Sequence, residues 1–264
     1  MSDTFSAVIL GIVEGVTEFL PVSSTGHLIL ADALLGYDPQ HWKLFNIAIQ
    51  PGAILAIVVL YWRTFLGVFK GLFSFEAGAI AFVRNVLIGF LPAAVLGFAL
   101  NDPLDTLLGN AQVVAWALII GGVAILIVER LAKPVKVGGV TALTWQRSLQ
   151  IGLAQCLALV PGVSRSGATI LGAMSLGVDR KTAAEFSFFL ALPTLTGATA
   201  LKLFKARDAI SSDDLSLIAI GFVVSFIVAL IVVKGFLAVV TRYGFAPFAW
   251  YRIVAGIAAL IWLG

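Results

Sequence analysis

The sequence predicts an all-α polytopic membrane protein with six transmembrane helices and two re-entrant helical hairpins, arranged as an inverted repeat. Of the 264 residues, 60% are hydrophobic and 12% are charged, whereas a soluble domain carries about twice that charged fraction. Six apolar runs are long enough to cross a bilayer, and two further apolar stretches are interrupted by Pro, Gly and hydroxyl residues. These two interrupted stretches also match each other, which indicates a duplication.

The composition excludes several classes of function. Enzymes and binding modules that work in water do not have this hydrophobic content. Cys156 is the single cysteine, so an internal disulfide and a cysteine-type zinc or iron–sulfur site are both excluded. The net charge of +3 is small and dispersed, which argues against a nucleic-acid partner. The acidic residues in and ahead of the first apolar run do not fit a cleaved signal peptide, so we expect the mature chain to begin here.

The first element is the hairpin at residues 4–35, which PVSSTGH interrupts, and its counterpart is the hairpin at 148–177, which PGVSRSGAT interrupts. Each half contains about a dozen residues, too few to cross about 30 Å of hydrocarbon, so a helix, a tight turn and a returning helix are expected. The crossings are apolar runs of the length that a bilayer requires. They cover residues 46–62, 82–100, 112–129, 184–202, 215–233 and 247–263.

The duplication appears when the second hairpin is set 141 positions after the first: Gly11 then falls on Gly152, Ser23 on Ser164, Gly26 on Gly167 and Asp38 on Asp179. Repeat 1 covers residues 1–131, a cytoplasmic linker covers 132–147, and repeat 2 covers 148–264. Each repeat holds one hairpin and three crossings. An odd number of crossings places the second repeat in the opposite orientation, so the repeats are expected to be inverted.

Positive charge in the connections predicts the orientation. With the loop at 63–84 placed inside, 11 of the 17 Lys and Arg residues fall on the inner side, 4 on the outer side, and two within membrane segments. Both termini are therefore expected outside. The first hairpin would enter from the outside and the second from the cytoplasm.

Glu14 and Glu18 are the first candidate functional residues. Their i, i+4 spacing places both carboxylates on one face of the first hairpin's entering helix. Two like charges in an apolar setting are tolerated when a cation lies between them, either a divalent metal such as Mg²⁺ or Ca²⁺ or a basic side chain. A protonated, hydrogen-bonded pair near the water boundary is the structural alternative.

The turn PVSSTGH supplies the hydroxyls of Ser23, Ser24 and Thr25, then Gly26 and His27. Hydroxyls and backbone N–H groups at a helix N-terminus suit a phosphate. The His27 imidazole is suited to nucleophilic or general acid and base catalysis. The alternative for His27 is a residue at a helix start that bonds a carbonyl.

The turn PGVSRSGAT places Arg165 between Ser164 and Ser166, followed by Gly167 and Thr169. A guanidinium fork among hydroxyls suits a phosphate. A buried arginine that only holds the structure together is the alternative. With inverted repeats, the two turns would meet near the midplane, where carboxylates, histidine and arginine converge on one pocket.

These motifs resemble a known family. The glutamate pair with EFLPVSSTGHL, the segment FNIAIQPGAILA, and PGVSRSGATI with AAEFSFFLALP resemble the undecaprenyl-diphosphate phosphatases of the BacA type over nearly the whole chain. The resemblance implies a bacterial inner-membrane enzyme, with its pocket open to the outside, that removes the terminal phosphate of undecaprenyl diphosphate. The monophosphate product carries peptidoglycan precursors, and bacitracin resistance follows because bacitracin sequesters the diphosphate. The Gln50–Pro51 step departs from the commoner family form.

The resemblance implies a set of site residues. The catalytic residues it implies are Glu14, Glu18, Ser24, His27 and Arg165, with a divalent cation on the two glutamates. The substrate contacts it implies are Ser23, Thr25, Gly26, Ser164, Ser166, Gly167 and Thr169. The expected partners are the polyprenyl diphosphate and the bilayer, and the sequence leaves open whether two copies form a homodimer.

Three chemical routes and two other functions stay open. Ser24 with His27 as its base is favoured, and direct attack by His27 or by activated water are the alternatives. A polyprenyl-phosphate flippase or transporter is the rival function, because inverted repeats with broken helices are common in transporters. A non-catalytic membrane scaffold is disfavoured by the clustered intramembrane charges.

Overall fold

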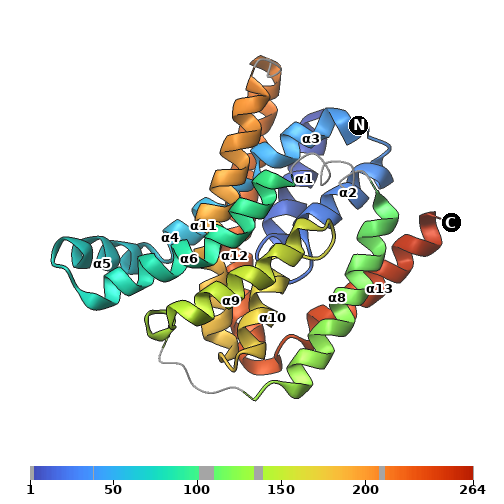
Figure 1. Ribbon diagram of the computed structural model, residues 1–264. Helices are drawn as coiled ribbons and strands as arrows, with labels where there is room; N and C mark the ends of the chain where they lie inside the picture. The colour runs from blue at the N-terminus through green and yellow to red at the C-terminus, as the bar shows by residue number, and fades with distance from the viewer. Residues whose placement is uncertain (1–2, 38, 101–109, 134–138, 208–211, 264) are drawn as a thin grey trace.

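The computed structural model describes residues 3–37, 39–100, 110–133, 139–207 and 212–263 (Figure 1), and these contain helices and no strand. The all-helical expectation is therefore confirmed. The α-helices are α1 (Asp3–Thr17), α2 (Ser24–Leu35), α3 (Pro39–Ala48), α4 (Gln50–Leu60), α5 (Trp62–Phe73), α6 (Ala77–Ala99), α8 (Ala111–Leu131), α9 (Trp145–Gln155), α10 (Arg165–Ser175), α11 (Arg180–Lys205), α12 (Ser212–Tyr243) and α13 (Ala246–Leu263), with short 3-10 helices η1 (Val140–Ala142) and η2 (Cys156–Leu159).

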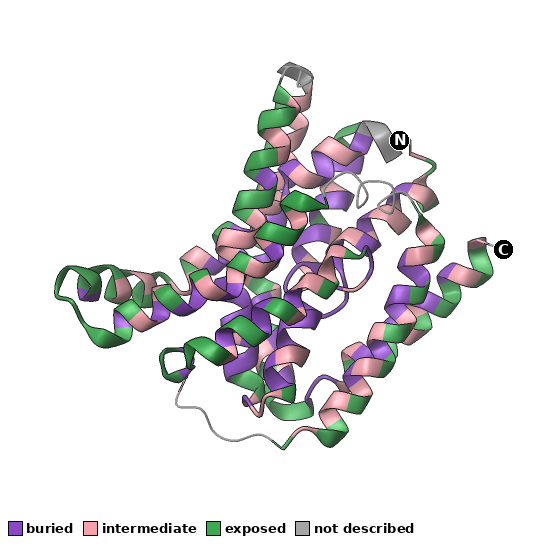
Figure 2. Cartoon of the chain, viewed as in Figure 1, coloured by how far each residue is buried: buried purple, intermediate pink, exposed green. Residues whose placement is uncertain are grey.

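Six helical segments are long and apolar enough to cross a membrane, as the hydrophobic runs predict. They are Trp42–Leu60, Ala77–Ala99, Ala111–Leu131, Arg180–Lys205, Asp214–Tyr243 and Ala246–Leu263. Large apolar side chains are exposed along their outer faces (Figure 2), for example Ile231, Ile261 and Val95. Such faces suit contact with lipid, because a bilayer solvates apolar side chains and leaves no reason to bury them.

The two interrupted stretches each form a helix, a turn and a second helix. Serine caps both second helices in the same way: the Ser23 hydroxyl accepts from Gly26 N at 3.3 Å, and the Ser164 hydroxyl accepts from Gly167 N at 3.0 Å. Both serines have positive φ, 74° and 79°, a conformation that costs energy for a residue with a side chain. Ser23 and Ser164, which match in the sequence, thus also share an unusual backbone conformation. Asp38, another of the matched residues, lies outside the described residues.

Helices of the two halves pack crosswise around these hairpins. α1 packs against α12, α9 packs against α6, and α8 and α13 lie along each other (Figure 1). Glycines allow the close approach in two of these contacts. A Cβ on Gly11 would lie 2.8 Å from Gly221 O, and one on Gly152 would lie 2.4 Å from Gly89 O.

An aromatic cluster fills the space between the first turn and α11 and α12. Phe19 contacts Phe188 edge-on at 5.5 Å, and Phe188 in turn contacts Phe236. These rings are almost completely buried. The cluster packs directly after the end of α1, where Glu18 lies next to Phe19.

One expectation about a connection was wrong. The predicted loop at 63–84 is helix α5 and the start of α6, because the apolar residues of α5 are spaced along one helical face instead of forming a continuous run. Within the segment expected as a linker, 132–147, Leu143 is buried and its carbonyl accepts from Asn85 Nδ2 at 2.6 Å.

Pro51 explains the break between α3 and α4. Proline lacks the N–H that a helix interior requires, but it is well suited to the first turn. α3 therefore ends at Ala48, and α4 begins at Gln50 with Pro51 in its first turn.

Candidate active site

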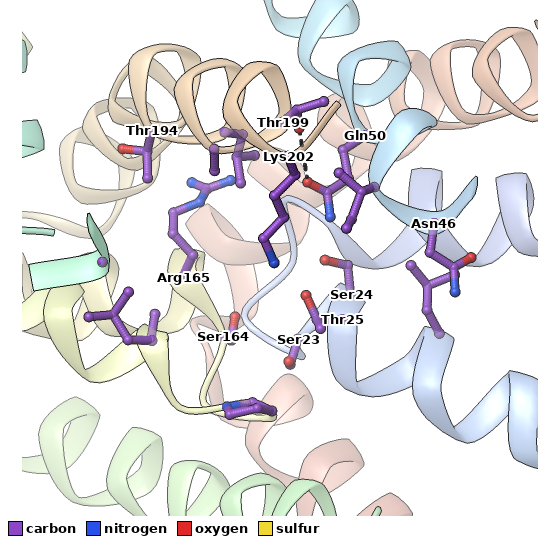
Figure 3. Close-up of a pocket in the computed structure, with 18 of the residues that line it drawn as sticks. Ser23, Ser24, Thr25, Asn46, Gln50, Ser164, Arg165, Thr194, Thr199 and Lys202 are labelled. Carbon is purple, nitrogen blue, oxygen red and sulfur yellow. Dashed lines mark hydrogen bonds between the residues drawn. The ribbon is translucent and has the colours of Figure 1, made fainter. Parts of the chain in front are cut away.

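A cavity of about 790 Å³ lies between the two turns and the helices α3, α4, α6 and α11, which is a volume typical of small-molecule sites. Its lining contains both polar and apolar side chains. The polar lining residues are Glu18, Ser23, Ser24, Thr25, Asp32, Lys43, Asn46, Gln50, Gln155, Ser164, Arg165, Thr194, Thr199 and Lys202 (Figure 3). The apolar lining residues include Phe90, Ala93, Phe98, Leu159, Leu195 and Leu201.

Glu18 connects the two turns. Its Oε1 accepts from Arg165 Nη2 at 2.9 Å, and its Oε2 accepts from the hydroxyl of Ser24. The side chains of Glu18 and Arg165 are 4% and 10% exposed, so little water screens the ion pair. Of the two cations expected at the glutamates, a metal or a basic side chain, the structure shows a basic side chain, Arg165, paired with Glu18.

The guanidinium of Arg165 is held from several sides. Nη1 donates to the carbonyl and hydroxyl of Ser187 at 2.9 and 3.2 Å, and the group lies 5.8 Å from the Phe19 ring centroid. Nε is buried and has no hydrogen-bond partner among the described residues. Arg165 is thus an oriented cation at the cavity wall.

Glu14 lies one turn before Glu18 and is completely buried. Neither of its carboxylate oxygens has a hydrogen-bond partner among the described residues. The cavity lining includes Glu18 but not Glu14. The residue matched to Glu14 in the second hairpin is Gln155, which does line the cavity.

The ring nitrogens of His27 contact residues other than Ser24. Its Nδ1 lies 2.8 Å from the carbonyl of Ser23, its Nε2 lies 2.8 Å from the hydroxyl of Tyr251, and its ring stacks on the Tyr251 ring at 5.6 Å. The cavity lining does not include it. The contact with Ser23 is the carbonyl bond that the sequence left open as the alternative for this histidine.

The remaining expected substrate contacts divide into two groups. Ser23, Thr25 and Ser164 line the cavity, whereas Gly26, Ser166, Gly167 and Thr169 do not. The Ser166 hydroxyl donates to Leu20 O at 2.7 Å, which joins the two turns, and Thr169 Oγ1 donates to Ser187 Oγ at 2.8 Å. In this structure both hydroxyls therefore bond within the protein.

Sequence reasoning missed two lysines of the cavity. Lys43 and Lys202 line it, and Lys202 extends from α11 toward the turn with Ser23, Ser24 and Thr25 (Figure 3). The charge count assigns both to the outer side. Lys202 lies in the last turn of α11 together with Lys205, so in the sequence it looks like an ordinary positive charge at a helix end and gives no signal for a site.

The comparisons with known proteins agree on one family. Residues 7–258 match the family described as "Bacitracin resistance protein BacA". The chain is 56% identical to an "Undecaprenyl-diphosphatase" of Novosphingobium aromaticivorans, covering 100% of this chain and 99% of that protein. A protein of the same name from Rhizorhabdus wittichii is 58% identical, with 98% and 97% covered, and one from Rhodopseudomonas palustris is 52% identical, with 99% and 97% covered.

Proposed function

The chain belongs to the BacA family, and we propose that its reaction takes place in the cavity between the two turns. The enzyme is an undecaprenyl-diphosphatase that hydrolyses undecaprenyl diphosphate to undecaprenyl phosphate and inorganic phosphate. Its product is the recycled lipid carrier, and its family is associated with bacitracin resistance. The transporter alternative is not favoured, because the relatives are named for the phosphatase.

The proposal rests on the two hydrogen bonds that the Glu18 carboxylate accepts, one from Arg165 and one from Ser24. A serine hydroxyl needs a base to act as a nucleophile, and Glu18 is the base that already accepts its hydrogen bond. Ser24 Oγ attacks the terminal phosphorus, the bond to the bridging oxygen breaks, and undecaprenyl phosphate leaves. Glu18 takes the serine proton. Water then attacks the phosphoserine, releases inorganic phosphate and regenerates Ser24.

Arg165 supplies the positive charge that phosphoryl transfer requires. Its guanidinium is held by Ser187 and Glu18, so little reorganisation is needed when negative charge develops on the phosphate. His27 has a positioning role in this proposal, because its bond to the Ser23 carbonyl holds the turn that carries Ser24. Direct attack by His27 is the competing route.

One observation at the glutamate pair, Glu14 and Glu18, fits a bound divalent cation, Mg²⁺ or Ca²⁺. The two buried carboxylate oxygens of Glu14 have no hydrogen-bond partner within the part of the chain that the structure describes, and hard cations take oxygen ligands. Within the described ranges, however, no cluster of three or more Asp, Glu, His or Cys residues is present, so water or substrate oxygens would complete the coordination. The ion would neutralise the glutamate pair and screen the phosphate charge.

The membrane arrangement completes the proposal. The crosswise packing of the two halves and the matched serine caps support an inverted repeat with two re-entrant hairpins. Lys43 of α3 and Lys202 of α11, which line the cavity, lie near helix ends that the charge count assigns to the outside. A cavity open to the outer side of the inner membrane, with both termini outside, agrees with this.

The experiment that tests the function measures phosphate release from undecaprenyl diphosphate by purified protein in detergent, with and without EDTA. Wild-type protein should release one phosphate per lipid, and Ser24→Ala should release almost none. After an acid quench, labelled substrate should leave an acid-stable phosphoserine on wild-type protein. An acid-labile phosphoenzyme would favour attack by His27. The absence of phosphate release by wild type would contradict the function itself.

A further inference from the structure

Arg252 is the largest side chain in the fully buried part of the core. It lies on α13, and 1% of its surface is exposed. None of the ion pairs among the described residues includes it. A guanidinium inside a membrane protein is costly unless other groups compensate its charge, so the groups around it define its role.

Backbone carbonyls from three separate segments surround the guanidinium. Nη1 donates to Pro21 O at 2.8 Å and Val163 O at 3.0 Å, and Nη2 donates to Gly162 O at 3.0 Å. Two further bonds reach α8, from Nη2 to Ala117 O at 3.0 Å and from Nε to Leu118 O at 3.3 Å. These five bonds match the five N–H donors of arginine.

The carbonyls that Arg252 contacts in the two turns lie one or two residues before the capping serines, Ser23 and Ser164. Val163 is next to Ser164, and Pro21 lies two residues before Ser23. Both serines have positive φ, which persists only when the surrounding structure enforces it. Arg252 thus holds the two turns at the points where each backbone is forced out of its usual conformation.

α8 provides the space for this group. A Cβ on Gly121 would lie 2.0 Å from Arg252 Nη2 and 2.6 Å from Cζ, closer than any real side chain allows. Gly121 is therefore a position where a single methyl group would displace the guanidinium while Arg252 itself is unchanged.

We propose that Arg252 is a positioning residue for the reaction. It fixes both turns to one guanidinium, and this keeps Ser24 of the first turn and Arg165 of the second turn in reach of the same phosphate. It does not touch the substrate: the cavity lining does not include it. This inference rests on the proposed function, because it assigns the two turns to one reaction centre.

The test compares kcat and KM of Arg252→Lys with wild type, for protein shown to be folded and monodisperse in detergent. Lysine keeps the charge but has three donors, so two of the five carbonyls lose a partner. Because misplaced reacting groups act on the transition state, kcat should fall about 30-fold or more, while KM changes less than about threefold. A merely structural role would lower the melting temperature and leave kcat of the folded protein unchanged, which would overturn the proposal.

Gly121→Ala provides a second route in case Arg252→Lys does not fold. It should lower kcat in the same way, whereas Gly235→Ala should behave as wild type, since a Cβ at Gly235 meets nothing within 4 Å. In the Arg252→Lys background, Gly121→Ala should add less than about twofold, because both changes act on one group. Full additivity, or wild-type kcat in Gly121→Ala, would contradict the proposal. Loss of turnover in wild type would instead refute the proposed function.

Discussion

Arg165 Nη2 lies 2.9 Å from Glu18 Oε1 across the interface of the two hairpins, although 147 residues separate them in the chain. The same carboxylate accepts a hydrogen bond from the hydroxyl of Ser24. A carboxylate, a guanidinium and a hydroxyl from the two hairpins are thus connected by hydrogen bonds. Residues that act as a unit lose most activity when any one is changed, and this sets the scale of the following predictions.

Arg165→Lys should lower kcat/KM for undecaprenyl diphosphate by about 100-fold, because lysine cannot reproduce a fork that contacts a carboxylate and a phosphate together. Phosphate release measures this. Arg180→Lys is the matched control. Arg180 Nη2 also lies 2.9 Å from a carboxylate, that of Glu129, but its side chain is 45% exposed. Activity of the control should stay within about twofold. Equal losses of kcat/KM in both variants would argue against a specific role for the Arg165 guanidinium.

Glu14→Gln should raise the concentration of Mg²⁺ or Ca²⁺ needed for half-maximal activity by about tenfold or more, because it removes charge from the ligand set. Binding of Mn²⁺, followed by its paramagnetic resonance signal, should weaken in parallel. Glu76→Gln, at an exposed glutamate, is the control. If neither the metal requirement nor Mn²⁺ binding changes, the cation does not bind at Glu14.

The membrane segments could be predicted from the sequence, because a bilayer requires about 20 apolar residues for each crossing and this leaves a readable pattern. The two turns were also identified, since Pro, Gly and hydroxyl residues interrupt the apolar stretches. α5 was not predicted, because its apolar residues follow one helical face and do not form the long apolar run by which the crossings were found.

The directions of individual side chains were less predictable. Ser164 and Ser166 look equivalent in the sequence, yet Ser164 lines the cavity and Ser166 bonds the carbonyl of Leu20. Each residue of a helix turns the side-chain direction by about 100°, so two positions two residues apart at the start of α10 point to nearly opposite sides. The sequence shows Arg252 only as an arginine within the apolar run 247–263, because its five acceptors are carbonyls of distant segments that no sequence pattern marks.

Tyr251→Phe should reduce kcat less than about threefold if His27 acts only by holding the turn, because the bond from His27 Nδ1 to the Ser23 carbonyl remains. Ser24→Ala should abolish nearly all turnover. If His27 is the nucleophile, the loss of the Tyr251 contact at Nε2 should change kcat strongly. Tyr243→Phe, at an exposed tyrosine, is the control for both variants, and phosphate release is the measurement.

Lys202→Gln should raise KM for undecaprenyl diphosphate about tenfold, because the lysine adds positive charge at the wall opposite the nucleophile. Inhibition by the product, a polyprenyl monophosphate, should weaken similarly. Lys205→Gln is the matched control, one turn nearer the end of α11 and exposed. Equal KM values in both variants would remove Lys202 from the phosphate site.

Sidedness can be tested with single cysteines in a Cys156→Ser background. The charge count places the 63–84 segment inside and the end of α11 outside. Lys205→Cys should therefore react with a membrane-impermeant thiol reagent in intact cells, and Ser74→Cys should react only after the cells are opened. Both positions are exposed, whereas Asp105 and Lys136, in the outer and inner connections, lie outside the described residues. The reverse labelling pattern would invert the orientation and would place the lysine-lined end of the cavity in the cytoplasm.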